Sequence, residues 1–339
     1  MPGARVRVPG AATWEVVGMR AIEVARFGGP EVLVPVEVPD PVPGAGEVVV
    51  EVVAADTLWV ETMVRSGRGG VTFPVRPPYR PGVGVAGTVT AVGPGVGAHW
   101  LGRRVVTRTG PAGGYVERAL VPVTGLAAVP DEVDTRDAAA VLHDGVTALA
   151  LADIVKLASA ERVLVTAAGG GLGAILVQLA HAAGATVVAA ARGAAKLDQV
   201  RELGAAVPVD YSAPDWTDRV REATGGLDVV LDGAGGDYGR AAFELVERGG
   251  RYSAHGTPAG AFGTVDPAVA RARGIAVTGI EAVQLGPDQF HAYLEQALAE
   301  VAAGRIRPLV GQTFPLARAA DAHAAIENRT AIGKTLLIV

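Results

Sequence analysis

Cysteine is absent from all 339 residues of the chain. This absence excludes disulfide bonds, thiolate catalysis and zinc held by cysteine. The six histidines are scattered singly, with no His-x₃-His pair and no compact cluster of acids and histidines of the kind that binds zinc. The sequence therefore predicts no metal centre, and a structural role is the first expectation for each histidine.

Long apolar runs and an excess of positive charge are also lacking. No run reaches the roughly 18–20 apolar residues of a membrane span. The segment before Met19 lacks the apolar core, about 7–15 residues long, of a secretory signal. The formal net charge of -5 gives no electrostatic attraction to nucleic acid or to anionic membranes. We therefore expect a cytoplasmic protein with no nucleic-acid and no membrane partner.

Aromatic residues make up only 5% of the chain and charged residues 19%, whereas half of the residues are hydrophobic. This composition is that of a compact globular protein rather than a disordered one. Because 339 residues exceed the size of one ordinary core, two domains are expected.

Glycine, by contrast, is abundant, and the most informative stretch is a glycine cluster. An apolar run at 163–165 leads into the cluster at 167–173, and a helical pattern begins at Ala174. Glycines let the backbone turn sharply, and the free N–H groups of the first helical turn favour an anion such as a dinucleotide pyrophosphate. A buried strand at 186–191 completes a βαβ unit, although in a chain of 46 glycines the cluster alone would also fit an ordinary turn. The candidate cofactor-binding residues of the turn are Ala167, Gly170, Gly171, Leu172 and Gly173.

The end of that second strand indicates which dinucleotide binds. An NAD site usually places Asp or Glu there, but this chain has Arg192 and Lys196 with no acid between them. Charge-assisted hydrogen bonds contribute roughly 1.5–3 kcal/mol each, so two of them would favour NADPH over NADH by about two to four orders of magnitude. The alternative is that both side chains are the solvated start of the next helix.

The pattern of elements changes midway along the chain. From Arg20 to about Val123, short valine-rich strands alternate with Pro/Gly turns, which suggests a small barrel. Residues 65–70 predict a flexible loop within it. From Gly145 to Ile280, strands alternate with helices, as in a doubly wound sheet. A helix at 288–303 and a strand at 334–339 complete the chain.

This order of elements resembles the medium-chain dehydrogenase/reductase superfamily, specifically its zinc-independent quinone (enone) oxidoreductase branch. The resemblance covers residues 19–339. The phrases that carry it are Phe27-Gly28-Gly29-Pro30, Gly145-Val146-Thr147-Ala148, the Ala-x-x-Gly-x-x-Gly turn (Ala167, Gly170, Gly173), Asp232-Gly233-Ala234-Gly235-Gly236 and Gly333-Lys334.

The resemblance implies an α/β fold with a GroES-like β-barrel domain plus a doubly wound Rossmann domain. The barrel would be the catalytic domain and comprise residues 19–143 and 283–339. The Rossmann domain would bind NADPH and comprise residues 144–282, with the active-site cleft between the two. Residues 1–18 would be a flexible extension. Relatives pair through an edge of the Rossmann sheet, which implies a homodimer by analogy.

The resemblance also implies cofactor contacts by position. Lys196 and Tyr211 match residues that grip the 2′-phosphate, and Arg192 would add to them. The remaining positions are Thr147, His255 and Gly256 toward the nicotinamide, and Arg329 and Lys334 in the C-terminal phrase. Tyr211 would alternatively be a turn aromatic and Lys334 a solvated strand residue.

The chain departs from the family pattern near the expected substrate. The usual Asn-Pro-x-Asp phrase is Leu58-Trp59-Val60-Glu61, the usual tyrosine is Met63, and the glutamate of the Pro-Gly-x-Glu phrase is Gly84. Leu58, Trp59 and Met63 would therefore line an apolar substrate cleft suited to a flat hydrophobic quinone or enone. Packing in the core is the alternative.

The implied reaction is hydride transfer from NADPH to a quinone or a conjugated enone. It requires a donor that stabilises negative charge and then delivers a proton. His143 is the candidate catalytic residue, with Asp144 beside it in the cleft, although the pair would also fit a helix cap. Water or a ribose hydroxyl would be other proton sources. A zinc-free alcohol or ketone dehydrogenase and a non-catalytic NADPH-binding protein are the alternative functions.

Overall fold

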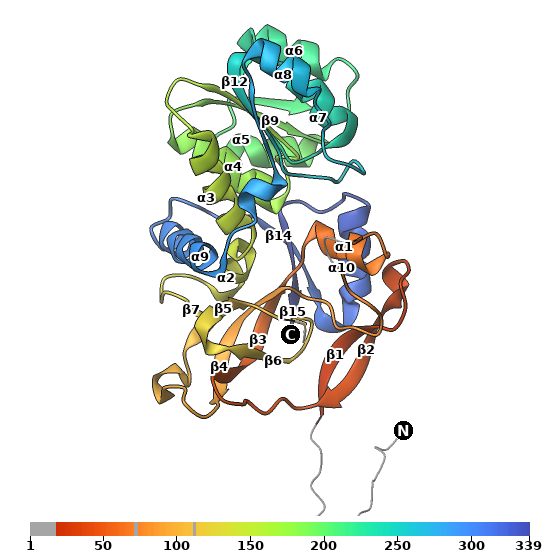
Figure 1. The fold of residues 1–339 in the computed structure, drawn as a ribbon, viewed down its shortest axis with the longest axis vertical. Helices are drawn as coiled ribbons and strands as arrows, with labels where there is room; N and C mark the ends of the chain where they lie inside the picture. Colours follow the sequence, from red (N-terminus) through yellow and green to blue (C-terminus); the bar gives the residue numbers. More distant parts are fainter. Residues whose placement is uncertain (1–17, 71–73, 111–112) are drawn as a thin grey trace, which may run out of the picture.

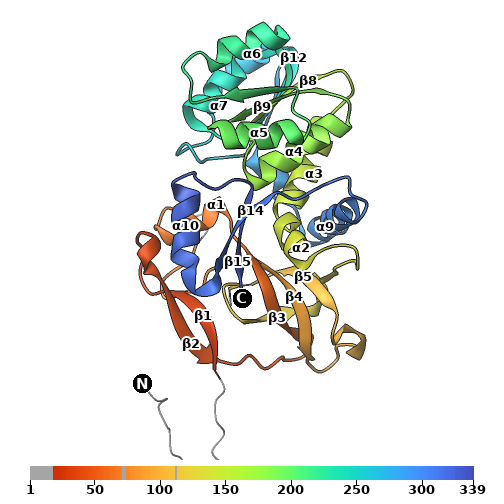
Figure 2. The same ribbon diagram turned by 180° about the vertical axis from the view of Figure 1, so that it is seen from behind.

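The computed structural model describes residues 18–70, 74–110 and 113–339, so all but the last residue of the predicted N-terminal extension lies outside the described residues. The described chain forms two parts stacked along its long axis, each built around its own sheet (Figures 1 and 2). Three helices lie between the parts: α2 (Thr135–Val141), α3 (Asp144–Val155) and α9 (Pro287–Ala302).

The first part contains a six-stranded parallel sheet in the order β10-β9-β8-β11-β12-β13. Its strands are β8 (Arg162–Thr166), β9 (Thr186–Ala191), β10 (Val207–Asp210), β11 (Leu227–Asp232), β12 (Val246–Ala254) and β13 (Ala276–Gly279). Its helices are α4 (Gly171–Ala182), α5 (Ala194–Glu202), α6 (Trp216–Thr224), α7 (Gly236–Phe243) and α8 (Pro267–Arg273). The first strand lies beside the fourth, which makes this the Rossmann order, with its ligand crevice at the carboxyl ends of β8 and β11.

The apolar run that predicts strand β8 is buried on both faces of the sheet. Val163, Leu164 and Val165 are each 0% exposed, as expected of a parallel strand covered by helices on both faces. The expectation of a doubly wound sheet is confirmed, and the strand predicted at 186–191 coincides with β9.

The second part contains the strands of the predicted barrel, and its sheet has the order β14-β15-β3-β4-β5-β7 with β6 paired to β3. These strands are β3 (Glu47–Asp56), β4 (Gly84–Val92), β5 (Arg104–Arg108), β6 (Arg118–Pro122), β7 (Ala127–Ala128), β14 (Val310–Pro315) and β15 (Lys334–Ile338). A separate pair is formed by β1 (Gly18–Val24) and β2 (Leu33–Pro39), and α1 (Trp59–Arg65) and α10 (Ala319–Glu327) complete this part. Short 3₁₀ helices lie at Pro30–Val32, Ala98–Trp100, Val123–Gly125, Ile280–Val283 and Leu316–Arg318.

The C-terminal strand contacts both parts of the molecule. β15 pairs antiparallel with β3, with Leu336 opposite Asp56. The start of β15 also touches the glycine turn of the Rossmann part, because the N–H of Gly333 donates to the carbonyl of Gly169 at 2.7 Å. The domain limits given above stay predictions.

One apolar core is continuous across that boundary. It includes Ala54 of β3, Leu142, Leu149 of α3 and Val163 of β8. Among the described residues, no single helix is long and apolar enough to cross a membrane; α2 and α3, bent by 44° relative to each other, satisfy the length and composition criteria only as a pair.

The predicted loop at 65–70 is wrong at its first residue. Arg65 is the last residue of α1 and is fully buried. Its guanidinium donates to the carbonyl of Gly28 at 2.9 Å and forms an ion pair with Glu327 of α10. A charged residue next to Ser and Gly is typical of a loop, but here two distant partners satisfy the charge inside the fold.

Candidate active site

The glycine turn between β8 and α4 has the geometry of an anion cradle. Helix α4 begins at Gly171, after Gly170 in extended conformation, so its first N–H groups have no side-chain cap from that position. Ala167 is left-handed, with φ of +52°. A Cβ on Gly173 would lie 2.5 Å from the carbonyl oxygen of Ala167, so only glycine permits this close approach. Leu172 occupies the second helical position.

Three cationic side chains, those of Arg192, Lys196 and Arg329, lie beside the end of β9. Lys196 donates to the carbonyl of Arg329 at 2.7 Å, and burial together with the charges of Arg192 and Arg329 lowers the pKa of Lys196. Within the described residues none of the three makes an ion pair. A cluster of unneutralised cations is complementary to a phosphate.

Aromatic rings hold the guanidinium of Arg192 in place. Its Cζ lies 5.4 Å from the ring centroid of Tyr211 and 5.1 Å from that of Tyr238, and it donates to the Tyr238 hydroxyl at 2.8 Å. Its buried Nε has no hydrogen-bond partner, which leaves a donor for a ligand. Tyr238 was not predicted, because it reaches this site only through the packing of α7.

The residues predicted to lie near a nicotinamide are Thr147, in the first turn of α3, and His255 and Gly256, which follow the carboxyl end of β12. Thr147 donates its N–H to the carbonyl of His143 at 2.9 Å. His255 is buried, with Nδ1 3.3 Å from the Ser253 hydroxyl, and burial lowers its pKa to about 4. His255 is therefore neutral at physiological pH. Gly256 follows it in the loop that leads away from β12. These assignments stay predictions.

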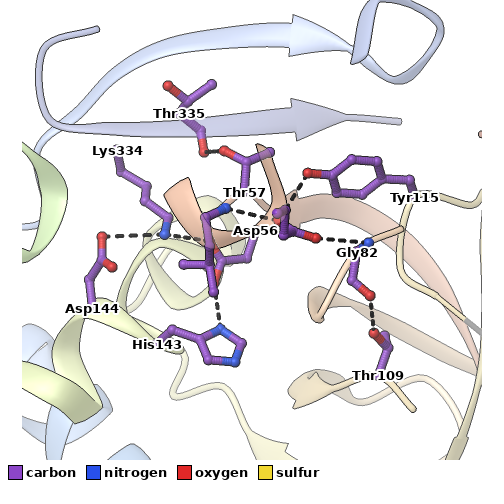
Figure 3. A network of polar contacts seen from close by, with 11 residues as sticks. Asp56, Thr57, Gly82, Thr109, Tyr115, His143, Asp144, Lys334 and Thr335 are labelled. Atoms are coloured by element: carbon purple, nitrogen blue, oxygen red, sulfur yellow. Dashed lines mark hydrogen bonds and ion pairs between the residues drawn. The ribbon is translucent and has the colours of Figure 1, made fainter. Parts of the chain in front are cut away.

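A buried cluster of charged side chains, Asp56, His143, Asp144 and Lys334, lies where β3, β15 and α3 meet (Figure 3). His143 Nδ1 is 2.6 Å from Oδ2 of Asp56, and Lys334 forms an ion pair with Oδ1 of the same carboxylate. Lys334 Nζ is also 3.3 Å from Oδ2 of Asp144. The partner of His143 is thus Asp56, which the sequence analysis missed, and not its neighbour Asp144. Lys334 is 4% exposed, so the solvated alternative for this residue is wrong.

The charges within the cluster decide its protonation. Burial opposes ionisation of Asp56, but attraction to Lys334 and the hydrogen bond with His143 outweigh it and lower the pKa of Asp56. Burial raises the pKa of Asp144 and the charge of Asp56 adds to this effect, which the attraction to Lys334 only partly offsets. The two carboxylates raise the pKa of Lys334 despite its burial. The result is an ionised Asp56 within hydrogen-bond distance of the His143 imidazole.

The cluster touches both the glycine turn and a cavity. A Cβ on Gly171 would lie 2.1 Å from Oδ2 of Asp144, so that carboxylate lies directly under the start of α4. On another side, His143 lines a cavity of about 770 Å³ between the end of β5 and α9, together with Arg108 and Phe290.

Leu58, Trp59 and Met63, predicted to line the substrate cleft, are not among the residues of that cavity. They are partly buried at the start of and within α1. Met63 faces the Rossmann part, since its Sδ accepts a hydrogen bond from the Thr257 hydroxyl at 3.7 Å. The apolar cleft therefore stays a prediction for these three residues.

A second buried carboxylate, Glu61, lies close by in α1. It accepts the N–H groups of Leu58 and Gly82, both at 2.9 Å, and the Tyr115 hydroxyl at 3.1 Å. Burial raises the pKa of Glu61 to about 7. Within residues 18–70, 74–110 and 113–339, no group of three or more His, Asp or Glu side chains is placed to hold a metal ion.

Comparison with known families gives two consecutive matches. A family model described as "Alcohol dehydrogenase GroES-like domain" matches residues 44–131, and one described as "Zinc-binding dehydrogenase" matches residues 203–337. The chain is 31% identical over 328 residues to the quinone oxidoreductase of Sus scrofa, covering 95% of this chain and 98% of that protein. It is 32% identical over 332 residues to a 2-haloacrylate reductase of a Burkholderia species, covering 94% and 98%.

Solved structures agree with these matches. Escherichia coli quinone oxidoreductase complexed with NADPH has a TM-score of 0.86 and 29% identity, and it covers 94% of this chain and 100% of its own. A mycobacterial protein complexed with NADPH has a TM-score of 0.85 and 33% identity, covering 95% and 100%.

Proposed function

We propose that this chain, which belongs to the zinc-independent, quinone oxidoreductase-like branch of the medium-chain dehydrogenase/reductase superfamily, is an NADPH-dependent oxidoreductase that reduces a quinone or a conjugated enone. Support for the cofactor comes from the glycine cradle and from the cations beside β9. The helix start at Gly171 suits the pyrophosphate, and Arg192, Lys196 and Arg329 suit the 2′-phosphate. Similar proteins of known structure bind NADPH.

The observation that carries the proposed chemistry is the 2.6 Å contact between His143 and Asp56 at the wall of the cavity. Because Nδ1 faces Asp56, Nε2 is the nitrogen left to act on a substrate. The ionised carboxylate accepts a hydrogen bond from Nδ1–H and holds the ring in one orientation. A protonated His143 is both a hydrogen-bond donor and a proton source.

When bound, NADPH supplies the hydride. As the new C–H bond forms on the acceptor, its conjugated electron pair moves to the carbonyl oxygen, where His143 would stabilise the negative charge through Nε2–H. His143 then gives this proton to the oxyanion of the reduced acceptor and takes up another from solvent. Each turnover thus consumes one hydride and one proton.

The experiment is NADPH oxidation, followed by absorbance across a panel of quinones and enones, for the wild type and His143→Gln. Loss of a general acid typically lowers the rate by about 10²–10⁴-fold, so we expect kcat to fall by at least about 100-fold, with NADPH affinity retained. The matched control is His99→Gln, an exposed histidine in the GroES-like part.

Two outcomes would contradict the proposal. Unchanged kcat in His143→Gln would remove the role of His143. Tight NADPH binding without turnover of any acceptor by the wild type would favour a non-catalytic NADPH-binding protein.

A further inference from the structure

Among the described residues that line the His143 cavity, Arg108 is the only lysine or arginine; its side chain is exposed, and the proposed reaction gives it no role. It ends β5, and its guanidinium carbon lies 4.0 Å from the ring centroid of Phe290 on α9. Among the described residues it forms no ion pair, and its guanidinium donates no hydrogen bond. Its five N–H donors are therefore available, while stacking on Phe290 fixes the plane in which they lie.

The acids around the cavity do not neutralise Arg108. Glu295 lies 3.3 Å from His291, its neighbour one turn earlier on α9. Asp288 is in the first turn of α9, where the helix dipole stabilises a negative charge. Burial lowers the pKa of Arg108, and no carboxylate opposes this effect. The guanidinium thus carries an unneutralised charge that a ligand could satisfy.

Phe290 connects this charge to the reacting end of the cavity. Its ring centroid is 5.6 Å from that of His143, and its face is covered by Arg108. An acceptor whose carbonyl reaches His143 and whose conjugated part packs along Phe290 would therefore bring its far substituent to Arg108. A guanidinium binds carboxylates through two parallel hydrogen bonds, a geometry that neutral substituents do not reproduce.

We infer that the acceptor is a short conjugated carbonyl compound that carries a carboxylate, with Arg108 as the residue that selects it. This inference rests on the proposed function. In the reaction, the hydride of NADPH forms a C–H bond at the carbon β to the ketone, the C=C electron pair moves to the ketone oxygen, and the resulting enolate takes the proton of His143. The carboxylate is unchanged and remains bound to Arg108.

The test compares 3-benzoylacrylate with its methyl ester as acceptors, because esterification removes the charge that Arg108 would bind. Loss of one charge-assisted hydrogen bond corresponds to about 10- to 100-fold in binding. We therefore expect wild-type kcat/KM to favour the acid by at least about tenfold. Arg108→Gln should raise KM for the acid by about 10- to 100-fold and leave KM for the ester unchanged, with partial recovery in Arg108→Lys.

A binding measurement and a control separate selection from general damage. Isothermal titration of 3-benzoylpropionate, the saturated acid, into the enzyme with NADP⁺ should show the same loss of affinity in Arg108→Gln. The matched control is Arg103→Gln, an exposed arginine just before β5 that does not line the cavity. It should leave both acceptors unaffected.

Failure of the inference and failure of the proposed function give different results. If neutral enones or quinones oxidise NADPH but the acid is no better than its ester, or if Arg108→Gln affects both equally, Arg108 does not select a carboxylate and the proposed function stands. If no acceptor of either kind oxidises NADPH, both proposals are wrong.

Discussion

Asp56 and Glu61 are close in the chain and both are buried, yet their surroundings shift their pKa values in opposite directions. Asp56 ends β3 and is 0% exposed, and Glu61 lies in α1 and is 6% exposed. The pKa of Asp56 is lowered, whereas burial raises that of Glu61 to about 7. Burial acts in the same direction on both carboxyls, so it cannot explain the difference.

The difference lies in the partners. Asp56 faces the ammonium of Lys334 and the imidazole of His143, whereas Glu61 accepts hydrogen bonds only from neutral donors, Tyr115 and two backbone N–H groups. Asp144 shares Lys334 with Asp56, and burial raises its pKa. Hydrogen bonds alone do not offset the loss of water around a buried carboxylate here, but a cation does.

The largest effect is expected from Lys334→Met, which removes the cation that makes Asp56 different from Glu61. Breaking a buried ion pair by removing one partner costs about 3–5 kcal/mol, because Asp56 and Asp144 would be left facing each other without a cation. Urea denaturation at pH 7 measures this loss in the free energy of unfolding.

The control for this variant is Lys156→Met. Lys156 is an exposed lysine at the end of α3, and its substitution should change the free energy of unfolding by less than about 0.5 kcal/mol. If Lys334→Met is no more damaging than Lys156→Met, the cation does not account for the contrast between the two carboxylates.

The next effect is a pH dependence that comes from Glu61. Below pH 4.5, its carboxyl is protonated in both the folded and the unfolded chain. Between pH 4.5 and about 7, the unfolded chain has released this proton while the fold still holds it, so the free energy of unfolding falls as pH rises. Above about pH 7 the loss is complete, at about 3 kcal/mol. Asp56 acts oppositely: its stabilisation is present above pH 3.8 and is lost only in acid.

Glu61→Gln isolates this dependence, because glutamine does not titrate. The free energy of unfolding of the wild type, minus that of the variant, should fall between pH 5 and pH 8, and other titrating groups cancel in the difference. A difference that is constant with pH would mean that Glu61 has an ordinary pKa in the fold, and the contrast with Asp56 would disappear.

How far the sequence predicts this molecule depends on how local each feature is. The strand at 186–191 and the glycine turn are set by adjacent residues, and both appear in the structure where the sequence puts them. Arg65 looks like a loop residue because its partners, Gly28 and Glu327, are remote in the chain. No local pattern contains such a partner.

The buried cluster, like Arg65, depends on partners that are remote in the chain. His143 was recognisable as a candidate from its position before a helix, but its partner Asp56 is 87 residues away, on β3. Lys334 joins them only because β15 returns to pair with β3. The one available signal was a carboxylate directly after the apolar end of a valine-rich strand, and that signal does not say which residue it faces.

The smallest expected effect comes from Asp56→Asn, which keeps the shape of the side chain but removes its charge. If Asp56 acts by orienting and stabilising a protonated His143, kcat should fall by about tenfold, the lower end for loss of a group that supports a catalytic residue. NADPH affinity should be retained. The control is Glu51→Gln, an exposed acid on the same strand.

The double variant decides whether Asp56 works through His143. Two residues that act as one unit are not additive, so Asp56→Asn combined with His143→Gln should be no slower than His143→Gln alone. Full additivity would mean that Asp56 influences turnover by another route, such as the position of Lys334 beneath the glycine turn. In that case the low pKa of Asp56 would report an ion pair that stabilises the fold, and the contrast with Glu61 would concern stability rather than catalysis.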